Sequence, residues 1–88
     1  MAKVTVKLFG VYRTDTHISS LPIEADTLTD VFYFLNEKVK ANAPAGVKPE
    51  EIKFKDALVY VDGEKCTKKN KGLINGCEVW IMSPASGG

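Results

Sequence analysis

The sequence contains little of what metal-binding and disulfide-rich proteins contain. It has two cysteines, Cys66 and Cys77, and the ten residues between them fit neither a zinc knuckle nor a redox pair. Its single histidine, His17, lies in a polar stretch with no second histidine or cysteine nearby. We therefore expect two reduced thiols, a histidine in a loop, and no metal site.

An excess of charge of one sign and a long apolar run are also missing. Twelve basic residues are balanced by eleven acidic ones, so the net charge of +1 gives no general attraction to nucleic acid or to an anionic membrane. No apolar run approaches the ~20 residues that cross a bilayer, and the start at residues 1–4 has no signal-peptide character. These features predict a cytoplasmic protein without a nucleic-acid or membrane partner.

The residue combinations that enzymes use for catalysis are absent from the sequence as well. No carboxylate pair has a partner base, no serine or cysteine has a histidine nearby, and no glycine-rich loop is suited to cradle phosphate. The sequence thus predicts a protein that is not catalytic alone and binds no cofactor of its own.

The first quarter of the chain predicts two strands. Alternation of apolar and polar residues indicates a half-buried strand over residues 3–12. A polar turn at residues 13–15 and a second strand at residues 18–25 complete a predicted hairpin, in which Pro22 favours an edge position.

A helix is predicted from residue 28 to about residue 40. Thr27 is suited to cap the first free amides, and Asp30 adds negative charge at the positive end of the helix. Apolar residues then recur at helical spacing, at Leu28, Val31, Phe32, Leu35 and Val39. Tyr33 lies off this stripe, and we expect it to be partly exposed.

The second half of the chain predicts further strands. Residues 48–52 predict one short helical turn, and residues 57–61 predict a strand that ends in an Asp62-Gly63 turn. Leu73-Ile74 is expected to fill the core before a last strand at residues 77–82. A chain of this length builds one domain with one small core. The order of elements predicts an α+β fold, a mixed sheet packed on one main helix.

The sequence ends in a short segment of small residues, which we expect to form a flexible tail. The predicted domain covers residues 1–82, and the predicted tail covers residues 83–88. Gly87 and Gly88 have no Cβ, so the end of the chain is able to enter a narrow cleft. The α-carboxylate is ionised at neutral pH and is a poor electrophile, so its chemistry requires activation by another enzyme.

The last strand and tail resemble those of a known family. Gly76-Cys77-Glu78-Val79, continued through Trp80-Ile81-Met82 to Gly88, resembles the end of the MoaD and ThiS sulfur carriers. The family pattern is a Gly-Asp-Glu-Val turn and strand, a proline-containing segment and a terminal Gly-Gly. Cys77 stands where the family usually has aspartate, and Ser83 where many MoaD members have a first proline. The resemblance implies the β-grasp, ubiquitin-like fold.

The resemblance also implies an activity. An E1-like enzyme of the MoeB or ThiF type adenylates the Gly88 carboxylate with ATP, and a sulfur donor then replaces the adenylate to give a thiocarboxylate. The leading hypothesis is a MoaD-like small subunit of molybdopterin synthase. Its tail threads into a MoaE-like large subunit and donates sulfur in molybdenum cofactor biosynthesis. The chain is expected to be a monomer when free.

Other functions stay open at this point. The same tail chemistry serves a ThiS-like carrier for thiamine, a CysO-like carrier for cysteine, and a small ubiquitin-like protein modifier. From a different class, the chain is a β-grasp binding module that is not a carrier. The final sulfur acceptor and the loading enzymes are not specified by the residues.

The tail needs help from the folded domain to bind a partner. Six extended residues reach at most about 20 Å, and ordering them costs roughly 6–12 kcal/mol. If Val79 and Ile81 face the core, alternation sends their neighbours to the opposite face of the sheet, where they either form a docking patch or simply cover the core. The partner contacts expected from strands and tail are Trp80, Met82, Tyr60, Ser83, Pro84, Ala85 and Ser86.

Overall fold

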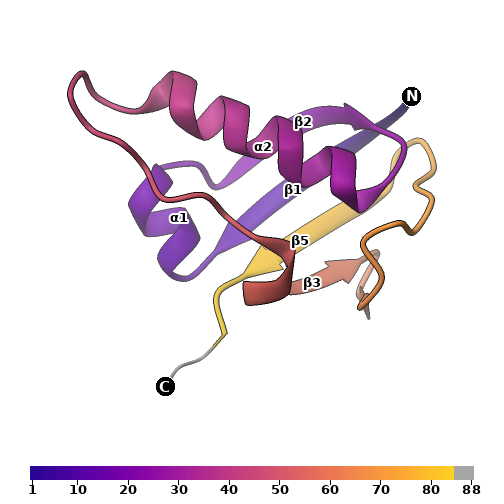
Figure 1. The fold of residues 1–88 in the computed structure, drawn as a ribbon. Coiled ribbons are helices and arrows are strands. Elements are labelled where there is room, and N and C mark those ends of the chain that lie inside the picture. The colour runs from indigo at the N-terminus through magenta and orange to yellow at the C-terminus, as the bar shows by residue number, and fades with distance from the viewer. Residues whose placement is uncertain (85–88) are drawn as a thin grey trace.

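A computed structural model describes residues 1–84 and shows a mixed five-stranded sheet with one long helix across one face (Figure 1). The strand order is β2-β1-β5-β3-β4, with β1 and β5 parallel at the centre and the other pairs antiparallel. In chain order the elements are β1 (Ala2–Phe9), α1 (Val11–Thr16), β2 (Ser20–Ala25), α2 (Leu28–Asn42), a 3-10 turn (Phe54–Asp56), β3 (Leu58–Val61), β4 (Glu64–Lys65) and β5 (Glu78–Met82). The predicted α+β architecture is confirmed.

The core lies between α2 and the sheet. Every second residue of the central strands points toward the helix, and Val79 and Ile81 of β5 are fully buried, as predicted. The helix contributes the predicted apolar stripe, Leu28, Val31, Phe32, Leu35 and Val39, all of them buried. The stripe and the alternating strands therefore account for most of the apolar core.

The start of α2 is capped in both directions. The Thr27 side chain accepts a hydrogen bond from the Asp30 amide (3.4 Å), and the Asp30 carboxylate accepts one from the Asp26 amide (3.3 Å). These two contacts satisfy amides that would otherwise have no partner at the helix start. Tyr33 is 61% exposed, as expected from its place off the stripe.

The predicted polar turn between the first two strands is wrong. β1 ends at Phe9, and the short helix α1 makes the connection to β2. Gly10 turns the chain with φ of +66°, and the hydroxyl of Thr14 donates to the Gly10 carbonyl. The polar residues that suggested a turn therefore lie on the exposed side of a helix. The antiparallel pairing of β1 and β2 is confirmed, with Pro22 on the edge strand.

Two further local predictions are wrong. Residues 48–52 form no helical turn, and the side chain of Asn36 binds both the amide and the carbonyl of Ile52 at the end of this segment. Leu73 packs against the core, but Ile74 is 71% exposed. The Asp62-Gly63 turn is confirmed, and both residues have the positive φ that a two-residue hairpin turn requires.

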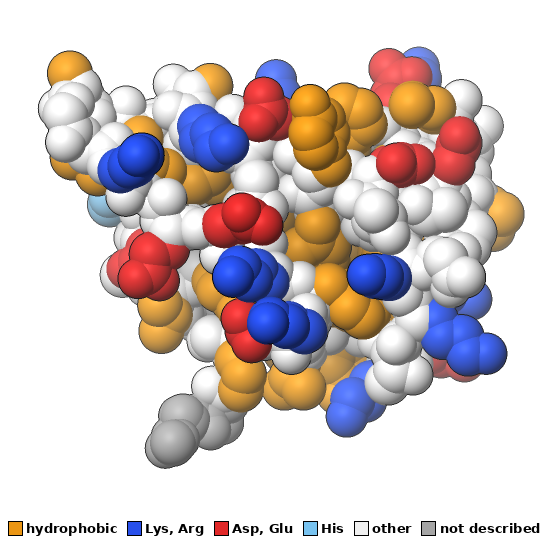
Figure 2. All heavy atoms as spheres, viewed as in Figure 1, with side chains coloured by type: hydrophobic (Ala, Val, Ile, Leu, Met, Phe, Trp, Pro, Cys, Tyr) orange, Lys and Arg blue, Asp and Glu red, His pale blue; other side chains and the backbone are white. Residues whose placement is uncertain are grey.

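The surface on the α2 side carries both signs of charge. Figure 2 shows acidic and basic side chains interspersed among apolar ones, with no broad field of one sign. No helix in the described part of the chain is long and apolar enough to cross a membrane. His17 lies at the end of α1, exposed, in a left-handed conformation, as expected for a loop residue.

Candidate functional site

The face of the sheet opposite α2 carries a cluster of large apolar side chains. We call it the open-face patch, and it consists of Phe9, Leu58, Tyr60, Trp80 and Met82, all half-buried. They are neighbours across three strands, since Tyr60 pairs with Trp80, and Met82 pairs with both Leu58 and Phe9. Within residues 1–84 no helix covers this face (Figure 1).

The patch contains the three strand residues predicted from sequence and two that were missed. Trp80, Met82 and Tyr60 lie side by side, as the alternation along the last strand predicted. Phe9 and Leu58 were not predicted. The signal for Phe9 was present, because it continues the outward positions of β1, whereas Leu58 required the register of β3 against β5.

The ring of Trp80 is held by its neighbours. Its centroid lies 6.1 Å from that of Phe9 in an edge-on arrangement and 6.4 Å from that of Tyr60. Its Nε1–H donates to the Glu78 carboxylate (2.5 Å), whose other oxygen lies 3.4 Å from the ammonium of Lys7. The hydrogen bond from Trp80, followed by the charge of Lys7, lowers the pKa of Glu78. The open-face patch is therefore ordered before any partner binds.

The chain leaves the sheet next to this patch. β5 ends at Met82 at the same end of the sheet as α1, and half-buried Ser83 and exposed Pro84 follow (Figure 1). The Ser83 hydroxyl accepts a hydrogen bond from the Val11 amide at 3.3 Å. The predicted tail residues Ala85, Ser86, Gly87 and Gly88 lie outside the described residues.

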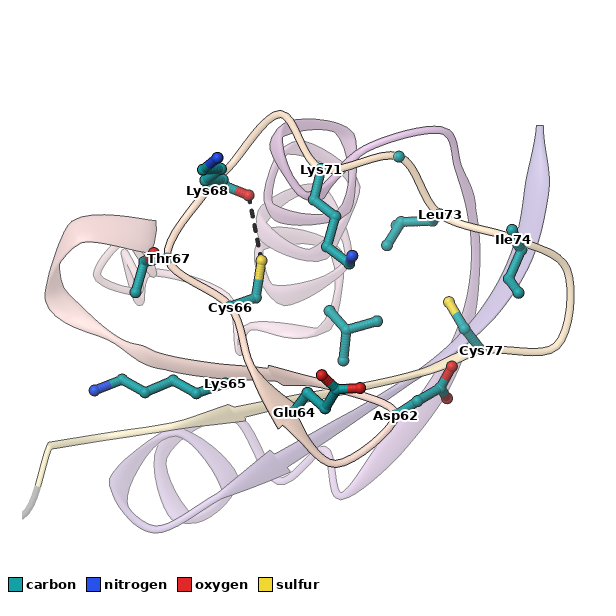
Figure 3. Close-up of a pocket in the computed structure, with 12 residues that line it drawn as sticks. Asp62, Glu64, Lys65, Cys66, Thr67, Lys68, Lys71, Leu73, Ile74 and Cys77 are labelled. Atoms are coloured by element: carbon teal, nitrogen blue, oxygen red, sulfur yellow. Dashed lines mark hydrogen bonds between the residues drawn. The ribbon is translucent and has the colours of Figure 1, made fainter.

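Both cysteines line a concavity of about 510 Å³ between the β3–β4 turn and the loop that leads to β5 (Figure 3). Their sulfurs face it from opposite sides, with Lys71 above and the carboxylates of Asp62 and Glu64 below. Both thiols are free, as expected. Among residues 1–84 no group of three histidine, cysteine or acidic side chains is placed to hold a metal ion.

The strand register explains why the two thiols are not joined. On one side of β3, the amide of Cys66 donates a hydrogen bond to the carbonyl of Val59, so Cys66 lies level with Val59. On the other side, Val79 pairs with Val61, and Cys77 lies two residues before Val79 and therefore beyond the end of β3. The two cysteines are thus offset by four residues along the strand direction, or about 13 Å. A disulfide requires Cα atoms within about 7 Å.

Comparison with known proteins shows similarity at the level of structure. No family model and no curated protein sequence matches the chain. The chain superimposes on the small archaeal modifier protein SAMP1 of Methanosarcina acetivorans with a TM-score of 0.77 and 25% identity, covering 100% of this chain and 98% of that one. SAMP1 of Haloferax volcanii gives a TM-score of 0.75 at 19% identity, covering 99% of this chain and all of that one.

A third similar structure is known in a complex. The structure of subunits 1 and 2 of the molybdopterin-converting factor of Helicobacter pylori matches with a TM-score of 0.63 and 20% identity, covering 98% of this chain and 99% of that one. The element order, the strand order and these full-length superpositions agree. The chain therefore has the β-grasp, ubiquitin-like fold that these modifier and MoaD-like structures share.

Proposed function

We propose that this chain is a ubiquitin-like carrier whose Gly88 carboxylate is activated by an E1-like enzyme. One observation carries the proposal. β5 supplies Trp80 and Met82 to the open-face patch and runs, two residues later, into the segment that leads to Gly88. A partner that covers the patch is thus close to the end of the chain. The similarity to small archaeal modifiers over both full lengths supports the same function.

The chemistry would proceed on the partner in two steps. An oxygen of the Gly88 carboxylate attacks the α-phosphorus of ATP, which forms the acyl adenylate and releases pyrophosphate. A sulfide-level sulfur from a donor then attacks the acyl carbon, and AMP leaves, which gives the thiocarboxylate. The new group is a softer and better nucleophile than the carboxylate, so the sulfur is readily passed on.

The open-face patch supplies the binding energy that the tail cannot. The small residues of the tail bury little apolar area on binding, whereas ordering their backbone costs about 1–2 kcal/mol per residue. Burying about 200 Å² of an aromatic side chain contributes on the order of 5 kcal/mol, and less for Trp80 because Phe9 and Tyr60 already cover part of its ring. The other four side chains of the open-face patch are also half-buried and would add to this contribution.

Two acceptors are proposed for the activated end. As a MoaD-like subunit, the chain would bind a MoaE-like large subunit and donate sulfur in molybdopterin synthesis, in line with the two-subunit complex of the Helicobacter pylori protein. As a protein modifier, it would form an amide bond when a lysine amine of another protein attacks the acyl carbon of the adenylate and AMP leaves. The second candidate is favoured by the TM-scores, which are 0.77 and 0.75 for the modifiers against 0.63 for the converting factor.

A loading reaction tests the proposal. Incubated with an E1-like enzyme, ATP and a sulfur donor, the chain should gain the mass difference between sulfur and oxygen, with release of pyrophosphate. The variant that lacks Gly88 should keep its melting temperature and gain no mass. If several E1-like enzymes give no adenylate and no thiocarboxylate, the chain is instead a β-grasp binding module.

A second measurement separates the two acceptors. Adding a MoaE-like subunit and a pterin precursor to the loaded chain should consume the thiocarboxylate and form a dithiolene product if the chain is MoaD-like. Expression of a tagged chain in its own cells should yield lysine adducts on other proteins if it is a modifier. Neither product, with loading intact, would direct the sulfur to a thiamine or cysteine pathway.

A further inference from the structure

We propose that the hydroxyl of Ser83 is a positioning group that fastens the base of the tail to the corner between β1 and α1. In this way it fixes the position of residue 83, the first residue after β5. The role in activation rests on the proposed function, because the tail is what the activating enzyme receives. The contact itself does not depend on it.

The sheet brings the two segments together. β1 and β5 run parallel, and Phe9 pairs with Met82 at the end of both strands. The next residues, Gly10 and Ser83, are therefore neighbours although 73 positions separate them in sequence. The Val11 amide, at the start of α1, donates to the Ser83 hydroxyl at 3.3 Å. Gly10 has no side chain with which to cap this helix, so Ser83, the residue that follows β5, takes that role.

Gly10 is shaped to accept this hydroxyl. Its φ of +66° is a conformation that favours glycine. A Cβ on Gly10 would lie 2.6 Å from the Ser83 Oγ but 3.8 Å from the Ser83 Cβ, so the space that the missing Cβ leaves is occupied by the hydroxyl alone. The two residues therefore fit as a pair.

The anchor changes what binding costs. Chain that is already held against the domain loses less conformational freedom when a partner orders it. Without the anchor, residue 83 would not be held against the domain, and the partner would have to order it as well. The anchor acts on binding and not on the chemical step. Loss of the anchor should therefore raise KM for the carrier and leave kcat unchanged when chemistry is slow relative to dissociation.

A double-mutant cycle tests the contact without any partner. The cycle compares the melting temperatures of the wild type, Gly10→Ala, Ser83→Ala and the double variant. Gly10→Ala strains the backbone equally with serine or alanine at position 83, so the effect of this strain on stability cancels in the comparison. The clash with Oγ does not cancel. Gly10→Ala should therefore lower the melting temperature more in the wild-type background than in Ser83→Ala.

Hydrogen exchange is a second test of the contact. The Val11 amide should exchange about fivefold faster in Ser83→Ala, and Ser83→Thr should restore its protection. Equal penalties and unchanged exchange would overturn the anchor.

Activation kinetics test the positioning role. Ser83→Ala should raise KM for the carrier about three- to tenfold at unchanged kcat, and Ser83→Thr should restore it. The control Ser20→Ala lies on the far edge strand and should change neither constant. An unchanged KM with a confirmed contact would overturn the positioning role. If the wild-type chain itself is not adenylated, the proposed function fails, while the cycle and the exchange rate still decide the anchor.

Discussion

At the scale of single residues, Glu78 organises the open-face patch. Its carboxylate accepts from the Trp80 indole on one side and pairs with the Lys7 ammonium on the other. A tryptophan on an exposed sheet face would otherwise sample several rotamers, and ordering them costs binding energy. Glu78 therefore holds the Trp80 ring in place, and this contact would favour the binding that we propose for the open-face patch.

The lowered pKa of Glu78 predicts a pH dependence. A group whose pKa is lower in the folded protein stabilises it above its unfolded pKa of about 4.3, and this contribution is lost as the pH falls through the folded value. Glu78→Gln should therefore flatten the fall in unfolding free energy with acidification, as measured by urea denaturation at a series of pH values. Trp80→Phe removes the Nε1–H that donates to Glu78 and should likewise flatten the fall in unfolding free energy with acidification. An identical slope in Glu78→Gln and wild type would contradict this assignment.

The two cysteines should differ in reactivity. Cys66 is half-exposed, whereas Cys77 is 3% exposed and its pKa is raised, chiefly by burial. Because the thiolate is the reacting species, iodoacetamide should label Cys66 in the folded protein and reach Cys77 only on unfolding. Peptide mass mapping with and without denaturant measures this, with Cys66→Ser as the control. Equal labelling rates in the folded state would show that Cys77 is not protected.

At the scale of elements, Asn36 fixes the long connection after α2. Its amide nitrogen donates to the carbonyls of Phe32 and Ile52, both at 2.9 Å, and its oxygen accepts from the Ile52 amide at 2.8 Å. Ile52 is buried, so its backbone groups need these partners. One side chain thus sets the path of residues 43–53 across the helix.

Loss of this side chain should be costly. Asn36→Ala leaves the amide and carbonyl of Ile52 without their partner and should lower the unfolding free energy by about 1–3 kcal/mol. Asn42→Ala, at the exposed end of the same helix, is the matched control and should change it little. Urea denaturation and the exchange rate of the Ile52 amide measure the effect. Equal stability of the two variants would show that the connection is held by other contacts.

At the scale of the whole molecule, β5 serves both faces of the sheet. Val79 and Ile81 point into the core, and Trp80 and Met82 point to the open-face patch. The period of two in a strand makes this division of roles possible within five residues. Substitutions along this single strand are therefore able to test the core and the open-face patch separately.

Substitutions on the two faces of β5 should separate these roles. Trp80→Ala should leave the fold intact and weaken binding to the activating enzyme at least tenfold, because the central ring of the patch is lost. Val79→Ala, its neighbour on the core side, should cost about 2 kcal/mol of stability and leave the affinity of the folded protein unchanged. Titration calorimetry and thermal unfolding measure the two effects. If Trp80→Ala binds the activating enzyme as tightly as the wild type does, Trp80 covers the sheet and does not contribute to binding.

The sequence by itself determined the parts of this protein that depend on local periodicity. The apolar stripe of α2, its cap at Thr27, and the opposite faces taken by Val79 and Trp80 all follow from residues a few positions apart.

Only the tertiary structure decided the rest. α1 replaced a predicted turn, with its first amide bound by Ser83, and residues 48–52 formed no helical turn, with Ile52 bound by Asn36. Leu58 joined the open-face patch through the register of two strands. In each case the deciding contact joins residues 16 or more positions apart, where local preference is weak and the energy of a packed or hydrogen-bonded partner prevails.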